Sequence, residues 1–238
     1  MSQTDTQSVA EGQSVAEGQS TDDTCRTTVC IGNLTASASH ELQNALAIIR
    51  ESAGLMEDFI NYAPEDEPEP SYKPKIVELL HTIQEQVVRG GDIAGGLNGL
   101  GHAWEEDGSD LNRVLEEFAI LAGRLGRMHG VTVGLDYGNT KVRAERAGLT
   151  LRVALFDVLQ ACFAHAHGSS LILSPHQHHG KPGVLITIAP STNDADIIDE
   201  VSLPKAVQRT GAHQLRANEL EHTPTLSTKH IYFMACDG

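Results

Sequence analysis

The spacing of apolar residues from position 42 onward predicts two long helices. Alternating steps of four and three residues separate Leu42, Leu46, Ile49, Ala53, Met56 and Ile60, which places them in one stripe along a helix. The same alternation continues through Ile76, Leu80, Ile83, Val87, Gly90, Ala94, Leu97, Gly101 and Trp104. The acidic, proline-rich segment 64–70 lies between the two runs and ends the first helix, because proline lacks a backbone N–H. The pattern therefore predicts an antiparallel helical hairpin.

A single hairpin buries only one stripe on each helix, so we expect a second copy to complete the packing. Two hairpins from a homodimer would close a four-helix bundle. The second helix also contains many glycines, each of which lowers helix stability by about 1 kcal/mol relative to alanine. These are Gly90, Gly91, Gly95, Gly96, Gly99 and Gly101. They indicate either close helix packing or a distorted, adjustable helix end, and the sequence leaves both interpretations open.

Beyond residue 105 the pattern alternates between helices and strands. The expected helices cover about 111–129, with Asp110 as the N-cap, about 149–165, and about 205–215. The expected strands cover 131–135, 170–173, 184–189 and 230–234. This order predicts an α+β domain over residues 110–238, with helices on one face of a mixed sheet. The hairpin domain is assigned to residues 31–105.

The first 30 residues have little to bury. The hexapeptide QSVAEG occurs at 7–12 and again at 13–18, in a segment rich in Ser, Gln, Glu and Gly. We therefore expect a disordered tail over residues 1–30. Cys25 and Cys30 lie at its end, but a zinc site would need two more ligands at similarly short spacing and none follow. We expect no metal there.

Composition narrows the function classes. Lys and Arg total 17 against 32 Asp and Glu, which gives a formal net charge of −15 over 238 residues and makes nucleic acid an unexpected partner. No run approaches the roughly 20 apolar residues of a transmembrane helix, and the polar amino terminus lacks a secretory signal. The four cysteines are scattered, which is typical of free thiols in a reducing compartment. We therefore expect a cytoplasmic protein without a membrane partner.

The segment 39–46, SHELQNAL, carries the candidate chemistry. His40 lies about 160° around the helix from Leu42, since each residue turns the helix by ~100°. Asn44 lies one turn further along the same exposed face. Glu41 is the immediate neighbour of His40 in the sequence. A neutral imidazole is a good nucleophile, and a neighbouring carboxylate can orient its ring. An amide one turn away can position an incoming phosphoryl group.

This segment resembles the phosphoacceptor box of two-component histidine kinases, commonly S-H-E-L-R-x-P-L or with Asn before the Pro. The match holds at Ser39, His40, Glu41, Leu42, Asn44 and Leu46, and departs at Gln43 and Ala45. The segment DLNRVLEEFAILAGRLGRMHGVTVGLD, at 110–136, is similar to the start of the kinase ATP-binding domain. The resemblance spans roughly residues 32–189 and weakens along the chain. It implies a phosphoacceptor hairpin followed by an ATPase-like α/β sandwich.

The nucleotide-binding features of that family are missing from the second part. Ala161 stands where the resemblance places a magnesium-binding Asn, and Asp157 falls at an earlier, less demanding position. The segment 190–196, where an adenine-contacting Asp-Gly turn belongs, contains no glycine, and 206–218 contains only Gly211. Glycines allow a backbone to approach and cradle phosphates. We therefore expect a degenerate ATPase-like domain that binds no nucleotide.

The resemblance and these departures lead to a histidine phosphotransferase. In this interpretation His40 accepts a phosphoryl group from a receiver-domain aspartate and passes it to another receiver, Glu41 orients the ring, and Asn44 positions the attacking group. The partners are response-regulator receiver domains and a second copy of the chain. The chain binds no cofactor, and Mg²⁺ comes from the receiver. Two alternatives stay open: a divergent ATP-dependent sensor kinase, and a non-catalytic receiver-docking regulator or phosphatase.

The remaining candidates are interpreted as ordinary surface residues. His176, His178 and His179 have the residue type of a metal site, but a solvated hairpin tip explains them better. Arg50 and Arg89 have the charge to meet an acidic receiver, but an ordinary solvated helix face explains them better.

Overall fold

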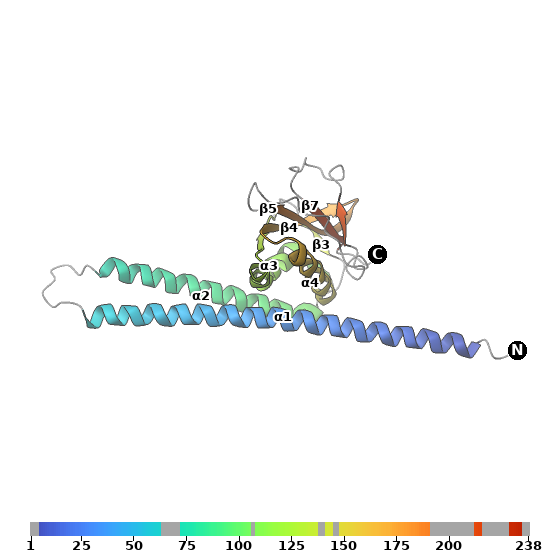
Figure 1. The fold of residues 1–238 in the computed structure, drawn as a ribbon, viewed down its shortest axis with the longest axis horizontal. Coiled ribbons are helices and arrows are strands. Elements are labelled where there is room, and N and C mark those ends of the chain that lie inside the picture. The colour runs from blue at the N-terminus through green and yellow to red at the C-terminus, as the bar shows by residue number, and fades with distance from the viewer. Residues whose placement is uncertain are drawn as a thin grey trace.

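The computed structural model describes residues 5–62, 72–105, 108–137, 141–144, 148–190, 212–215 and 229–234. Helix α1 (Asp5–Asn61) and helix α2 (Lys73–His102) lie side by side, and α2 returns along α1 (Figure 1). A short 3-10 turn, η1 (Ala103–Glu105), follows α2. Both helices expected from the apolar spacing are therefore present, and the proline-rich segment between them lies outside the described residues.

Helix α1 begins much earlier than expected. The disordered tail predicted over residues 1–30 is wrong from Asp5 onward, where α1 is helical, and residues 1–4 lie outside the described part of the chain. Cys30 is fully buried with Leu34 and Ala38 in the core of the molecule, and Arg26 hydrogen-bonds to Asp157 in the α/β domain. The steps of four from position 30 to 38 continue an apolar stripe toward the amino terminus, and tertiary contacts stabilise this part of the helix.

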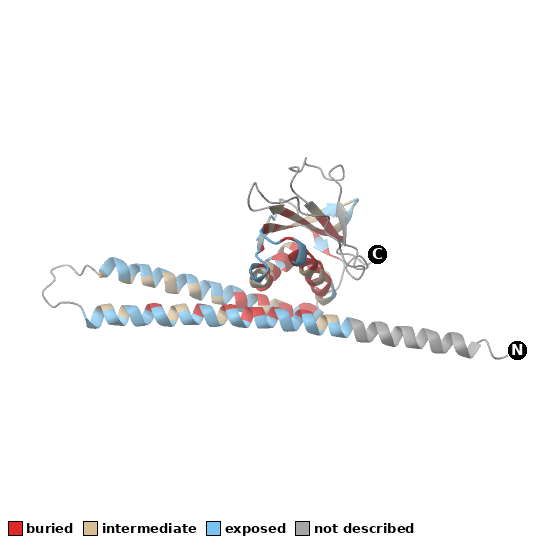
Figure 2. Ribbon diagram, in the orientation of Figure 1, coloured by how far each residue is buried: buried red, intermediate tan, exposed pale blue. Residues whose placement is uncertain are grey.

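The buried stripe of the hairpin lies one residue away from the expected one. On α1 it follows Ala38, Glu41 and Ala45, whereas Leu46 is 63% exposed and Ile60 61% exposed. On α2 the buried positions are Ile93, Gly96 and Leu100, and Val87 and Trp104 are among the exposed residues. Figure 2 shows the buried residues of the hairpin concentrated beside the α/β domain. The stripe predicted from apolar spacing therefore includes apolar residues that face solvent and lies beside the stripe that is buried.

The second part of the chain is the expected α+β unit. Asp110 caps α3, and its side chain accepts a 3.0 Å hydrogen bond from the backbone N–H of Asn112. The five-stranded sheet has the order β2-β4-β5-β7-β6, in which only β2 and β4 pair in parallel. The elements are β1 (Ser109–Asp110), α3 (Leu111–Met128), β2 (Thr132–Leu135), β3 (Arg143–Ala144), α4 (Gly148–His165), β4 (Ser169–His178), β5 (Lys181–Pro190), β6 (Ala212–Leu215) and β7 (Lys229–Met234). The mixed sheet with helices on one face confirms the predicted α+β class.

The last helix predicted for the α/β domain is also wrong. The helix expected near 205–215 is a strand at its described end, where β6 (Ala212–Leu215) pairs antiparallel with β7. The edge of β7 that faces away from β5 offers backbone hydrogen bonds to this segment, and such tertiary pairing overrides weak local preferences. Residues 205–211 lie outside the described part of the chain.

The molecule has three layers that share one core. Helices α3 and α4 lie between the sheet and the α1–α2 pair (Figure 1). A single cluster of buried apolar residues includes Leu34 of α1 and Leu100 of α2 together with residues of α3, α4 and the strands. Helix α4 is buried on nearly every side, from Leu151 to Phe163. The α/β domain is therefore packed onto the helix pair through a continuous apolar interior rather than tethered beside it.

Two glycines of α2 explain how α3 comes so close. A Cβ on Gly96 would lie 3.3 Å from the Glu117 carbonyl oxygen and from Leu121 Cγ, and a Cβ on Gly99 would overlap the Glu117 carboxylate. Gly91 and Gly95 have open space where a Cβ would be. Of the two interpretations of this glycine-rich helix, close packing therefore holds for Gly96 and Gly99.

Candidate functional site

His40 and Asn44 lie on the exposed face of α1, where the helical periodicity places them. Both residues are exposed, and residues four apart on a helix are neighbours on its surface. Helix α1 is continuous through this segment. The imidazole is therefore accessible to a second protein, with an amide one turn away.

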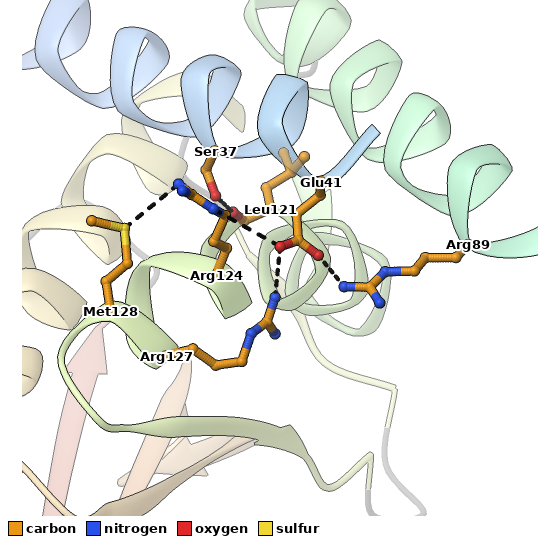
Figure 3. A network of polar contacts seen from close by, with 7 residues as sticks. All are labelled: Ser37, Glu41, Arg89, Leu121, Arg124, Arg127 and Met128. Carbon is orange, nitrogen blue, oxygen red and sulfur yellow. Dashed lines mark hydrogen bonds and ion pairs between the residues drawn. The ribbon is translucent and has the colours of Figure 1, made fainter. Parts of the chain in front are cut away.

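Glu41 points the other way. Its side chain is only 9% exposed and lies between three helices (Figure 3). One carboxylate oxygen, Oε1, accepts a 2.9 Å hydrogen bond from Arg127 and lies 4.0 Å from Arg124 Nε. The other, Oε2, accepts a hydrogen bond from Arg89. The structure thus brings Glu41 to arginines of α2 and α3 and not to the imidazole of His40, whose orientation the sequence interpretation had assigned to it.

The same turn of α1 has further contacts with α3. Ser37 is buried, and its hydroxyl donates a 3.0 Å hydrogen bond to the Leu121 carbonyl oxygen. Arg124 also contacts Met128, with Nη1 3.5 Å from the sulfur (Figure 3). The inner side of the turn that carries His40 is therefore fixed, while its outer side faces solvent.

The three arginines around Glu41 form what we call the arginine cluster: Arg89, Arg124 and Arg127. Three guanidinium groups face one carboxylate, so the group carries a formal charge of +2 in a chain of −15. The side chains of Arg89 and Arg127 are 49% and 51% exposed, and that of Arg124 is 28% exposed. Sequence reasoning considered Arg89 but missed the other two, since only the packing of α3 on α1 brings them to Glu41.

Two α4 residues occupy positions where the resemblance to histidine kinases predicts nucleotide-binding residues. Asp157 accepts a 3.0 Å hydrogen bond from Arg26 Nε and a second from Arg26 Nη2. Ala161, in place of the expected Asn, is buried in the apolar core. The glycine-poor segment 191–196 and most of 206–218 lie outside the described residues. Within the part that is described, α4 presents a carboxylate already paired with α1.

A partly buried ion pair joins α3 to α4 next to Gly99, with the Glu117 side chain 17% exposed. Arg152 is 1% exposed and donates a 2.6 Å hydrogen bond to Glu117 and a 3.2 Å hydrogen bond to the Gly148 carbonyl oxygen. Arg113 lies 3.3 Å from the other Glu117 oxygen. Because charged groups are stable in a protein interior only when paired, Glu117 is held firmly at this point.

The histidines near the end of β4 contact one another and β7. His178 is the last residue of β4 and His179 begins the turn to β5; their ring centroids are 4.1 Å apart, and the Tyr232 ring centroid lies 5.2 Å from that of His178. No group of three or more His, Cys, Asp or Glu side chains in the described ranges is arranged to hold a metal ion. None of the helices described is both long enough and apolar enough to span a membrane.

Two buried cysteines, Cys30 and Cys162, have thiols of low reactivity. Burial raises the pKa of the Cys30 thiol to about 12, with a further contribution from the nearby Asp157 carboxylate. Burial alone raises the pKa of Cys162 to about 12. Since the thiolate is the reactive form, neither residue is a candidate nucleophile.

Comparisons with known proteins do not establish a family. No family model and no curated protein matches the chain. Among solved structures, a bacterial phosphotransferase is 10% identical, with a TM-score of 0.42 over 85% of this chain and 94% of that one. The cytoplasmic segment of histidine kinase QseC is 12% identical, with a TM-score of 0.38 over 74% and 100%. Histidine kinase AdeS of Acinetobacter baumannii is 13% identical, with a TM-score of 0.35 over 82% and 98%.

Proposed function

We propose that the chain is a histidine phosphotransferase of a two-component phosphorelay. His40 accepts a phosphoryl group from the phosphoaspartate of one receiver domain and returns it to the aspartate of another. Asn44 positions the incoming group from the next turn of the helix. The magnesium ion that the transfer requires belongs to the receiver domain.

The observation that carries this proposal is the contrast between the two sides of α1 at residue 40. His40 and Asn44 are open to solvent, whereas Ser37 and Glu41 are buried against α3. An exposed imidazole on a turn whose inner side is held suits an in-line reaction with a docked protein, because alignment supplies much of the rate when both phosphorylated forms are high in energy.

The packing of the α/β domain favours this function over an ATP-dependent kinase. A kinase must bring a nucleotide held by this domain to the imidazole. Here the domain shares its core with α1 and α2, and Asp157 of α4 is paired with Arg26 of α1. Ala161 has no group that could bind magnesium. We therefore assign the domain a role in holding the hairpin and the docked receiver.

The proposed transfer is a simple displacement at phosphorus. A nitrogen of the neutral His40 imidazole attacks the phosphorus atom, an N–P bond forms, and the O–P bond to the aspartate breaks. The aspartate leaves as a carboxylate, and the imidazole loses its ring proton to solvent. The reverse sequence passes the phosphoryl group to a second receiver.

We also propose that the active form is a homodimer. Apolar side chains remain exposed along both helices, including Leu46, Ile60, Leu80 and Val87. A second hairpin packed on them would close a four-helix bundle and remove this surface from water. Sedimentation equilibrium should give twice the chain mass, and Leu80→Lys with Val87→Lys should give the monomer.

The phosphotransfer experiment compares two donors. The purified chain is incubated with radiolabelled ATP alone and, separately, with receiver domains labelled on aspartate. We expect acid-labile, base-stable label on the chain only from the receiver, and none on His40→Ala. The matched control is His81→Ala, since His81 is another exposed histidine of the hairpin, and it should be labelled like the wild type.

Two outcomes would contradict the proposal. Label taken from ATP alone would make the chain a kinase and would show that the α/β domain binds nucleotide. A chain that binds receivers but takes no label from either donor would be a docking regulator.

A further inference from the structure

We propose that the arginine cluster, gathered around Glu41, is the docking surface for the acidic phosphorylation face of a receiver domain. This inference rests on the proposed function, because it names the part of the surface that recognises the phosphate donor. It assigns Arg89 and Arg127 to recognition, with Arg124 supporting them.

The charge distribution of the chain leads to this surface. With a net charge of −15, the chain as a whole repels an acidic partner. A receiver presents acidic side chains around its phosphoaspartate and the magnesium ion they bind. The excess of two positive charges in the arginine cluster therefore provides the attraction that productive docking needs. Complementary charges across an interface also fix the orientation of the receiver on the hairpin.

The location fits a complex centred on His40. Glu41 is the next residue along α1, and adjacent Cα atoms are only about 3.8 Å apart. An interface that buries about 800 Å² on each partner covers a disc of roughly 16 Å radius. Although Glu41 points about 100° away from His40 around the helix, a disc of this radius centred on the His40 imidazole is wide enough to extend over the exposed halves of Arg89 and Arg127.

The arginines keep hydrogen-bonding capacity for such a partner. A guanidinium group has five N–H donors in a planar fork. In the described part of the chain, Arg89 and Arg127 each donate one hydrogen bond, to Glu41, and about half of each side chain is exposed. Planar guanidinium groups bind carboxylate and phosphate oxygens in pairs. Glu41 neutralises part of the repulsion among the three cations and so keeps them beside His40.

The test separates docking from chemistry at His40. The receiver that labels the wild-type chain fastest is used to measure transfer to Arg89→Ala and Arg127→Ala at low and at physiological salt. We expect the apparent KM to rise about tenfold, with less change in the saturated rate and a weaker dependence on salt. Phosphoramidate, a small donor that needs no docking surface, should phosphorylate His40 equally in all variants.

Matched variants control for charge and for folding. Arg113→Ala removes the same charge from α3, but Arg113 precedes Arg127 by 14 residues, about 21 Å along the helix, so its KM should be unchanged. Arg89→Lys and Arg127→Lys keep the charge but lose the paired geometry, and should show an intermediate KM. Thermal melts verify that each variant is folded.

The outcomes distinguish the two proposals. A folded Arg89→Ala, Arg127→Ala double variant with wild-type KM and salt dependence would overturn the docking surface while leaving phosphotransfer intact. If the wild type takes label from no donor, phosphotransfer fails, and titration calorimetry with a beryllofluoride-treated receiver still measures docking. Binding about tenfold weaker in the double variant supports the docking surface, whereas equal binding or no binding to the wild type overturns it.

Discussion

Replacing Gly99 by alanine should destabilise the protein, although alanine is the better helix former. Relative to glycine, alanine in a helix interior contributes about 1 kcal/mol of stability. At position 99, however, the added methyl group would overlap the Glu117 carboxylate. A flexible carboxylate elsewhere would simply turn away.

Glu117 is not free to do so, because it is the partner of Arg152. That guanidinium is 1% exposed and donates its 2.6 Å hydrogen bond to Glu117. Moving the carboxylate away would leave the buried Arg152 guanidinium unpaired, and an unpaired buried charge destabilises a protein by about 3–5 kcal/mol. After subtracting the gain of about 1 kcal/mol in helix propensity, we expect Gly99→Ala to lower the free energy of unfolding by about 2–4 kcal/mol.

The assay is urea denaturation of Gly99→Ala and Gly95→Ala beside the wild type. Gly95 is the matched control, since it lies one turn away on the same helix and no atom lies within 4 Å of the place its added methyl group would take. Its substitution should raise stability by about 1 kcal/mol. Equal stability of the two variants would refute the account of Glu117 as a fixed group. It would mean that Glu117 and Arg152 move together without loss of their ion pair.

Two other predictions concern α1 and the thiols. Asp157→Asn should weaken the contact of Arg26 with α4. Because the pair is partly exposed, the free energy of unfolding should fall by at most about 1 kcal/mol. Amide hydrogen exchange should become faster in the first half of α1, and an unchanged exchange pattern would contradict the contact. In native protein, Cys25 is exposed and should react with a thiol reagent at pH 8 in seconds to minutes. Cys30 and Cys162, with pKa values of about 12, hold only about one part in 10,000 as thiolate at that pH, so mass spectrometry should find them modified only after unfolding.

The elements that depend on local signals could be predicted from the sequence. Asp110 ends an extended segment and begins a regular apolar period, and the structure has the N-cap there. The exposed position of His40 agrees with the helical periodicity, although the buried stripe lies one residue away from the one used as reference. The α+β class follows from the order of helical and strand patterns.

What the sequence could not supply are the contacts between distant segments. The disordered tail was expected because residues 1–30 contain few apolar side chains, yet Cys30 and Arg26 meet α4 more than 120 residues away. Glu41 was assigned to His40 because the two are adjacent, whereas three arginines on other helices attract its carboxylate more strongly than a neutral ring would. The strand at 212–215 depends on the available edge of β7, which no local pattern describes.

The continuous core has a consequence for protein engineering. A domain exchange usually cuts the chain at a linker and joins the parts from two proteins. A cut between Glu105 and Gly108 would here separate Leu34 and Leu100 from the α3 and α4 residues with which they form one apolar cluster. A chimera with a foreign α/β domain should therefore aggregate or melt early unless the inward faces of α1 and α2 are exchanged with it, so the transplantable unit is the whole described fold.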